Sequence, residues 1–166
     1  MATIKLIYGS TTGNTETAAE QIASALGAHD VTTVSASDAS AADFADAENL
    51  ILGTSTWGVG DLQDDWEGLL SDLEGADLSG KTVALFGCGD SASYSDTFVD
   101  GMGTLYNAVI AAGGKVVGST STDGYSHSDS IAIVDGQFVG LAIDDDGGNN
   151  DERMAAWVAA ISPEFN

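Results

Sequence analysis

Residues 4–27 read IKLIYGSTTGNTETAAEQIASALG and predict a strand, a tight turn and a helix in immediate succession. The apolar run from Ile4 to Tyr8 is typical of a buried strand, and apolar residues recur at helical spacing from Thr15 to Leu26. Gly27 is a common residue at the end of such a helix. A strand that leads through a short loop into a helix favours a parallel sheet with crossover helices.

The rest of the chain repeats this alternation. Further strands are predicted at residues 31–34, 50–53, 82–87 and 116–118, and further helices at 66–73, 101–112 and around Met154, Trp157, Val158 and Ile161. Residues 130–134 and 138–143 resemble two extra strands around the turn Asp135-Gly136. We interpret them as part of an insertion of about twenty residues before the last helix.

The predicted fold class is therefore α/β, with residues 1–166 forming a single domain. It is a three-layer sandwich in which a five-stranded parallel sheet of order 2-1-3-4-5 has helices on both faces. Sheets of this order bind ligands beyond the carboxyl ends of the strands, where the order reverses. The loops at residues 9–15, 55–65 and 88–98 are thus expected to form the site.

Acidic residues dominate the charge, with 26 Asp and Glu against four Lys and Arg and a net charge of -22. Such a charge disfavours nucleic acid and anionic membrane as partners and attracts basic protein surfaces. Two interpretations stay open, a solubility device suited to high salt and a docking surface. Cys88 is the single cysteine, so no intramolecular disulfide can form, and no ligand-spaced cluster indicates a metal. Without a leader-like or membrane-spanning segment, a cytoplasmic monomer is expected.

The first loop, Gly9-Ser-Thr-Thr-Gly-Asn-Thr15, opens a helix. Free N–H groups and the positive end of the helix dipole make such a position suitable for an anion, and four hydroxyls add neutral donors. The loop lacks the Gly-Lys-Ser/Thr ending of a triphosphate loop and the spacing of a dinucleotide fingerprint. With no Lys or Arg in it, a terminal monophosphate is favoured.

Each of the other two loops places an aromatic residue beyond a buried strand, Trp57 in the second and Tyr94 in the third. Two aromatic rings beside a phosphate pocket can cover both faces of a flat heterocycle. A planar ligand that carries one phosphate is thus the best fit.

At this point the sequence resembles flavodoxins. The resemblance rests on Gly9-Ser-Thr-Thr-Gly-Asn-Thr15, Thr54-Ser-Thr-Trp57, Gly60-Asp-Leu-Gln-Asp-Asp-Trp66 and Gly87-Cys-Gly-Asp-Ser-Ala-Ser-Tyr94. The runs Thr122-Asp-Gly-Tyr125 and Phe138-Val-Gly-Leu-Ala142 are similar to the long-chain type, whose insertion interrupts the fifth strand. Two positions depart from the pattern: Ser55 stands where proline is common, and Cys88 where Thr or another small residue is common.

The resemblance implies a flavodoxin-like fold with an insertion in the fifth strand. It also implies non-covalent FMN, low-potential one-electron transfer between semiquinone and hydroquinone, and no enzymatic activity. It implies a phosphate held by the first loop, Trp57 and Tyr94 on the two ring faces, and Thr56 and Asp146 near the ribityl chain. Asp144 and Asp145 are alternatives to Asp146. The full set of expected cofactor-binding residues is Ser10, Thr11, Thr12, Gly13, Asn14, Thr15, Ser55, Thr56, Trp57, Gly58, Val59, Gly60, Cys88, Gly89, Asp90, Tyr94, Asp96, Phe98 and Asp146.

Gly58 and the nearby acids set the expected redox behaviour. The resemblance implies that the peptide after Trp57 turns its carbonyl toward the flavin, which favours a neutral semiquinone. The Gly58-Val59 unit can adopt the required positive-φ turn because glycine has no Cβ. Carboxylates around the site should then disfavour the anionic hydroquinone; they are Asp61, Asp64, Asp65, Asp90, Asp96 and Asp100.

The partners that the resemblance implies are redox proteins with basic docking surfaces, such as a flavodoxin/ferredoxin NADP reductase, photosystem I or nitrogenase. One alternative is an FMN-dependent quinone reductase of the same fold. A phosphate-accepting receiver domain is a second, but it needs an acidic cluster after the first strand and a lysine after the fifth, and neither is present at Gly9-Ser10 or Gly118-Ser119.

Overall fold

A computed structural model describes residues 3–9, 14–57, 61–62, 64–89, 98–122, 130–144 and 150–165. Its central sheet has the order β2-β1-β3-β5, and the fifth position is shared by β6 and β10, which both pair with β5. These strands span Thr3–Gly9 (β1), Asp30–Ser35 (β2), Asn49–Trp57 (β3), Thr82–Gly89 (β5), Lys115–Val117 (β6) and Leu141–Asp144 (β10). All of these pairings are parallel, so the predicted order is confirmed.

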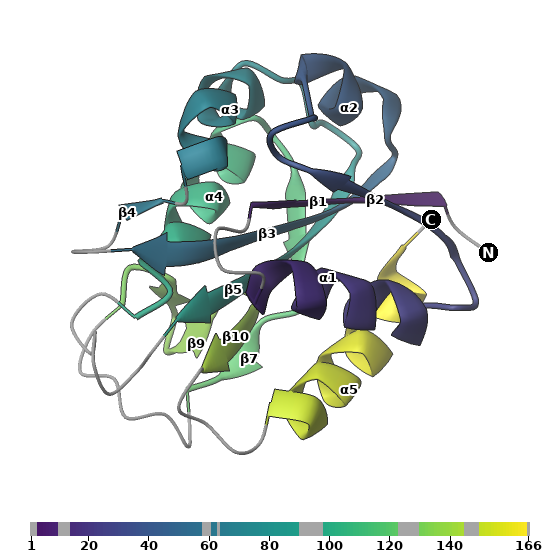
Figure 1. The fold of residues 1–166 in the computed structure, drawn as a ribbon, viewed down its shortest axis with the longest axis vertical. Helices are drawn as coiled ribbons and strands as arrows, with labels where there is room; N and C mark the ends of the chain where they lie inside the picture. The colour runs from purple at the N-terminus through teal and green to yellow at the C-terminus, as the bar shows by residue number, and fades with distance from the viewer. Residues whose placement is uncertain are drawn as a thin grey trace.

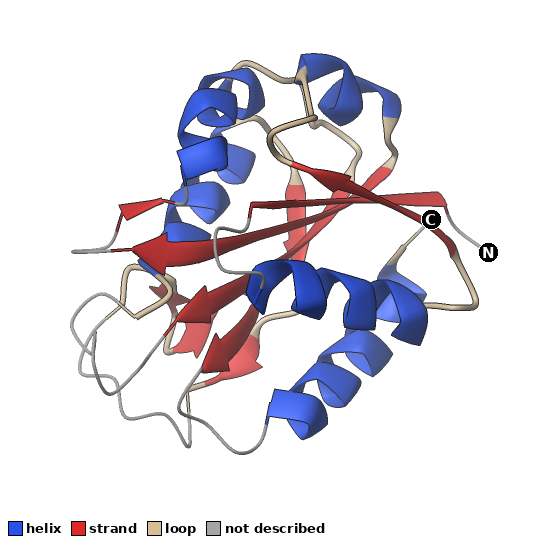
Figure 2. Cartoon of the chain, viewed as in Figure 1, coloured by secondary structure: helices blue, strands red, loops and turns tan. Residues whose placement is uncertain are grey.

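Helices cover both faces of the sheet (Figures 1 and 2). On one face lie α1 (Asn14–Ala25) and α5 (Asn150–Ile161), which a short 3-10 helix, η1 (Ser162–Glu164), follows. On the other lie α2 (Ala41–Asp46), α3 (Asp64–Glu74) and α4 (Asp100–Ala111). The molecule therefore has the predicted three layers.

Alternation along the strands divides the buried side chains between two cores. Ile7, Leu52 and Leu85 pack on the side of α2, α3 and α4, whereas their neighbours Leu6 and Ile51 pack on the side of α1 and α5. All five are fully buried. Near-continuous apolar runs are expected for parallel strands that are covered on both faces.

The predicted insertion is confirmed, but its strands lie elsewhere than expected. Residues 138–143 do not form one extra strand, because β10 pairs with the end of β5 as the second half of the fifth strand. The insertion forms a separate small sheet from β7 (Thr120–Ser121), β8 (Ile133–Val134) and β9 (Gln137–Phe138). Asp135 and Gly136 make the predicted turn between β8 and β9, with φ angles of 55° and 81°.

Two further elements were not predicted. The helix α2 has only six residues, of which Phe44 is the one large apolar side chain, so no helical periodicity could show. Its first turn is fixed by Asp43, whose carboxylate accepts from the Ser40 N–H and from Lys5 Nζ, at 2.8 Å each. The second element, β4 (Asp61–Leu62), pairs back on the end of β3.

Candidate functional site

The carboxyl ends of β1, β3, β5 and β10 meet at one edge of the sheet. In the strand register Gly9 lies beside Thr54, Ser55 beside Cys88, and Asp144 beside Gly89. The arrowheads of β3, β5 and β10 point the same way in Figure 1. Four segments that are far apart in the sequence therefore lie side by side along this edge, each within one strand spacing of the next, as the predicted strand order requires.

The helix α1 presents its N-terminus to this edge, because it begins at Asn14, shortly after β1 ends. Thr15, in its first turn, is 1% exposed, and its Oγ1 finds no hydrogen-bond partner among the described residues. A buried hydroxyl without a partner is costly, by about 1 to 3 kcal/mol. Next to the free N–H groups of a helix N-terminus, it suits an anion with several acceptor oxygens.

The end of β3 is held in place from both faces of the sheet. A Cβ on Gly53 would lie 2.0 Å from the ring of Phe86, so glycine is required for that ring to lie across the strand. On the other face, the indole N–H of Trp66 donates to the Gly53 carbonyl at 2.7 Å. These contacts fix the strand four residues before Trp57.

Ser55, Thr56 and Trp57 belong to β3, so the expectation that they lie in a loop beyond the strand is wrong. The reason is β4, which pairs Asp61 with Trp57 and Leu62 with Thr56 and so extends the strand. A strand of two residues has no periodicity that a sequence could show.

Cys88 and Gly89 likewise end β5 instead of standing in the following loop. Cys88 is 3% exposed in the core under α1 and α5. Phe98 lies at the other end of the third loop and is 1% exposed in the opposite core. Gly89 allows the two ends of the third loop to pack closely. A Cβ at this position would lie 3.2 Å from Phe98 Cδ1 and 3.3 Å from the Val99 nitrogen.

The insertion is bound to the end of this third loop, a contact that no sequence pattern predicts. Ser130 Oγ donates to the Phe98 carbonyl, and the Ile131 N–H donates to Asp100 Oδ1 at 2.8 Å. The rings of Phe98 and Phe138 meet edge to face at 5.7 Å. These contacts lie on both sides of Val99. Its φ is 47°, in the left-handed region that β-branched residues rarely adopt.

Asp100 consequently differs from the other acids predicted to surround the ligand. It is 8% exposed, and its carboxylate caps the N–H of Ile131. Among the described residues it is thus a buried anchor of the insertion as well as a negative charge near the edge. The side chains of Asp61, Asp64 and Asp65 lie outside the described part of the structure.

Asn150, at the start of α5, binds the end of β10 through two hydrogen bonds. Asn150 Oδ1 accepts from the Asp144 N–H at 3.1 Å, and Asn150 Nδ2 donates to the Asp144 carbonyl at 2.8 Å. Asp144 is 3% exposed beside Gly89. Asp145 and Asp146, the other candidates in this run, lie outside the described residues.

The described charges next to the first loop are acidic. Tyr8, close to the end of β1, donates to Glu16 Oε1 in α1 at 3.4 Å. Burial raises the pKa of the Tyr8 phenol, and the carboxylate of Glu16 raises that pKa further. The phenol therefore remains protonated at neutral pH and adds no negative charge.

The remaining predicted site residues fall outside the described residues, and their roles stay predictions. They are Ser10, Thr11, Thr12, Gly13, Gly58, Val59, Gly60, Asp90, Tyr94 and Asp96. The backbone is described at Asn14, Thr56 and Trp57, but their side chains are not.

No helix in the described ranges is long and apolar enough to cross a bilayer. The family described as Flavodoxin matches residues 6–157. A flavodoxin of Trichodesmium erythraeum is 47% identical over 99% of both chains, and flavodoxin 1 of Azotobacter vinelandii is 40% identical over 99% of this chain and 98% of its own. A crystal structure of Fusobacterium nucleatum flavodoxin bound to flavin mononucleotide superposes with a TM-score of 0.95 at 35% identity, covering 100% of both chains.

Proposed function

Because this chain belongs to the flavodoxin family, we propose that residues 1–166 act as one FMN-binding domain that carries single electrons between redox proteins. The FMN-bound relative from Fusobacterium nucleatum supports FMN as the ligand. The quinone reductase alternative is not favoured, since the matching relatives are flavodoxins along nearly the whole chain.

The observation that carries the proposal is the buried hydroxyl of Thr15 at the N-terminus of α1. The sequence contains four basic residues, Lys5, Lys81, Lys115 and Arg153, and none of them lies in the three predicted loops. A phosphate monoester therefore has to be held by hydroxyls and N–H groups. Several uncharged donors together can bind the phosphate, because each hydrogen bond to a charged acceptor is worth about 1.5 to 3 kcal/mol.

The other roles that we propose belong to residues at or after the carboxyl ends of the strands. Ser10, Thr11, Thr12, Gly13 and Asn14 bind the phosphate together with Thr15, and Thr56 and Asp146 contact the ribityl chain. Trp57 and Tyr94 cover the two ring faces, and Gly89 and Asp90 contact the pyrimidine edge. Bound FMN supplies reversible one-electron chemistry, and the protein's residues hold it, orient it and exclude water from it.

The backbone after Trp57 is proposed to affect the reduction potentials of the bound FMN. We propose that the carbonyl of Gly58 accepts a hydrogen bond from the flavin N5 position when that atom is protonated. Carboxylates near the same edge then disfavour further negative charge on the bound ring. Together these groups separate the first reduction potential from the second and make the second strongly negative.

We further propose that the protein works in the cytoplasm as a monomer and meets partners with basic docking surfaces. A reductase of the flavodoxin/ferredoxin NADP type, photosystem I and nitrogenase are candidates of this kind. The net charge of -22 supports such partners, since it accelerates encounter with a cationic surface at low salt.

Stepwise reduction of the purified protein with added FMN tests the proposal. We expect tight one-to-one binding, a yellow spectrum and two separate one-electron potentials. The variant Thr17→Val changes an exposed residue on the same helix as Thr15. It controls for effects of purification and folding on FMN binding. A folded protein that takes up no FMN would refute the ligand, and steady NAD(P)H oxidation by the protein alone would instead support an enzyme.

A further inference from the structure

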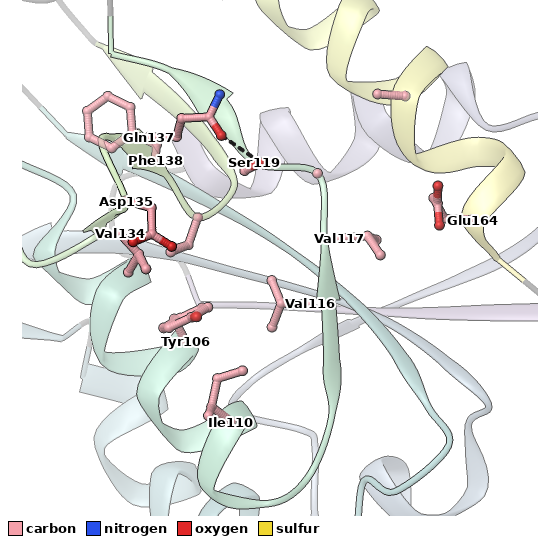
Figure 3. A pocket seen from close by; sticks show the side chains of 13 residues that line it. Tyr106, Ile110, Val116, Val117, Ser119, Val134, Asp135, Gln137, Phe138 and Glu164 are labelled. Atoms are coloured by element: carbon pink, nitrogen blue, oxygen red, sulfur yellow. Dashed lines mark hydrogen bonds between the residues drawn. The ribbon is translucent and has the colours of Figure 1, made fainter.

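A second concave site lies between the insertion and the edge of the sheet, away from the three loops. Its volume is about 510 Å³. Figure 3 shows Tyr106 and Ile110 of α4 on one side, Val116 of β6 behind, and Val134 and Phe138 of the insertion on the other. We call this site the edge groove.

The edge groove exposes apolar side chains to solvent. Ile110 is 48% exposed and Val134 is 38% exposed, and both line it. The other large hydrophobic residue with such exposure among the described residues is Ile131, at 54%, which does not line the groove. Exposed apolar side chains beside polar ones in a concave site are typical of a surface that binds a partner.

The back of the edge groove is an open strand edge. Among the described residues β6 pairs only with β5, and the Lys115 N–H donates to the Lys81 carbonyl at 3.1 Å. Successive residues of a strand direct their main-chain groups to opposite sides. The N–H and C=O of Val116 therefore point away from β5, where they can pair with an added strand.

The charge of the groove favours a cationic occupant. Asp135 and Glu164 line it and are exposed. Lys115 lies 3.8 Å from Glu164, but with exposures of 70% and 48% this ion pair is largely screened by solvent. The protein as a whole carries -22, which disfavours a second copy of this chain as the occupant.

The strand edge of the groove and the proposed FMN site lie toward opposite ends of β5, although Phe138, which lines the groove, also packs on Phe98 at the end of the third loop. Val117 pairs with Ala84 near the start of β5, and Gly89 at the other end of β5 borders the third loop. Five residues of strand separate Ala84 from Gly89, which is about 17 Å at about 3.3 Å per residue. A segment in the groove would leave the edge with the three loops free.

We propose that the edge groove binds an extended, lysine- or arginine-containing segment of a redox partner, which pairs with Val116 as an added strand. Apolar side chains of the segment pack on Ile110 and Val134, and its cationic side chains lie near Asp135 and Glu164. This proposal rests on the carrier function only in naming a redox partner as the source of the segment.

The test uses the ¹⁵N-labelled protein with FMN bound and a synthetic peptide, acetyl-Lys-Val-Lys-Val-Lys-Val-amide. A second peptide with the same side chains but with every backbone amide N-methylated offers no N–H on either edge and cannot pair as a strand. We expect amide shifts centred on Val116 and Ile110, and binding at least about tenfold weaker for the methylated peptide, as for the loss of a hot-spot contact.

A matched pair of variants locates the site. Ile110→Gln removes an exposed apolar side chain from the groove, and Ile131→Gln removes one outside it. We expect the first to weaken peptide binding about tenfold and the second to leave it unchanged. FMN that stays with both variants after gel filtration shows that they are folded, and stepwise reduction of the same samples tests the carrier function.

Four results would overturn the proposal. They are no binding at millimolar peptide, shifts spread over the acidic surface or confined to the three loops, equal affinity for the methylated peptide, and equal loss in the two variants. Concentration-dependent shifts at Val116 without peptide would show instead that a second copy fills the groove. If the spectrum is normal and the peptide fails to bind, only this inference fails and the carrier function stands.

Discussion

Replacing Thr15 by valine should change the apoprotein and the FMN complex in opposite directions. The side chain is 1% exposed, and Oγ1 has no partner among the described residues. Valine has nearly the same shape and removes a buried polar atom that costs about 1 to 3 kcal/mol. We therefore expect the apoprotein to gain about 1 kcal/mol, which raises Tm by about 2 to 4 °C for a chain of this size.

The same change should weaken FMN binding, because the hydroxyl is proposed to donate to the phosphate. A hydrogen bond to a charged acceptor is worth about 1.5 to 3 kcal/mol, and its loss raises Kd about 10- to 150-fold. Fluorescence titration of FMN into apoprotein measures Kd, and thermal unfolding of the same samples measures Tm.

Two control variants separate the hydroxyl from general effects on the helix. Thr15→Ser keeps the hydroxyl and should restore most of the affinity. Thr17→Val, exposed on the same helix, should leave Kd unchanged. A Thr15→Val protein that is less stable as the apoprotein and unchanged in Kd would refute the reasoning, since the hydroxyl would then have a structural partner.

Three more predictions concern the frame of the site and its charge. Gly53→Ala should lower the free energy of unfolding by about 3 kcal/mol or more, because its Cβ would lie 2.0 Å from the Phe86 ring; denaturant titration measures this, and a loss under about 1 kcal/mol would contradict it. Asp43→Asn should lower stability by about 0.5 to 1 kcal/mol at pH 7, since the hydrogen bond from Lys5 lowers the pKa of the Asp43 carboxyl. A lowered folded-state pKa stabilises the protein above the unfolded value of about 4, so the two proteins should converge as the pH falls below about 4, and a difference that persists there would exclude this cause. Raising NaCl from about 0.01 to 1 M should raise Tm, because the Debye length falls from about 30 to 3 Å and the self-repulsion of a chain with net charge -22 is screened; a constant Tm would contradict it.

Strand order could be predicted because β1, β3 and β5 are apolar runs, and each is followed along the chain by a helix with its own signals. Ile4 to Tyr8 and Leu50 to Gly53 are of this kind, and both lie in the observed strands. The division of the fifth strand could be expected only from the resemblance. In the sequence alone residues 138–143 form one apolar run, and nothing local shows that Leu141 leaves the small sheet to pair with Phe86.

The site could be predicted to the level of its loops, because the strand order brings their ends together. What the sequence could not show are the contacts that hold those ends. Ser130 meets Phe98 and Ile131 meets Asp100 across some 30 positions, and neither residue type signals such a contact. Thr15 is different, because its position at a helix N-terminus after a strand is a local signal that the structure supports with a buried, unpartnered hydroxyl.

The placement of acidic residues bears on the two interpretations of the charge. Asp30, Asp46 and Glu48 are exposed at the amino edge of the sheet, opposite the proposed FMN site. Glu16, in the first turn of α1, is exposed near the carboxyl edge, so acids of the described residues lie at both edges. Acids at both edges attract a cationic partner from both sides, so they raise the encounter rate without selecting one edge. Solubility in salt and attraction of partners are then both served by the same acids. Orientation must come from uncharged features, and the described surface offers one in the edge groove, where Ile110 and Val134 stand beside an open strand edge.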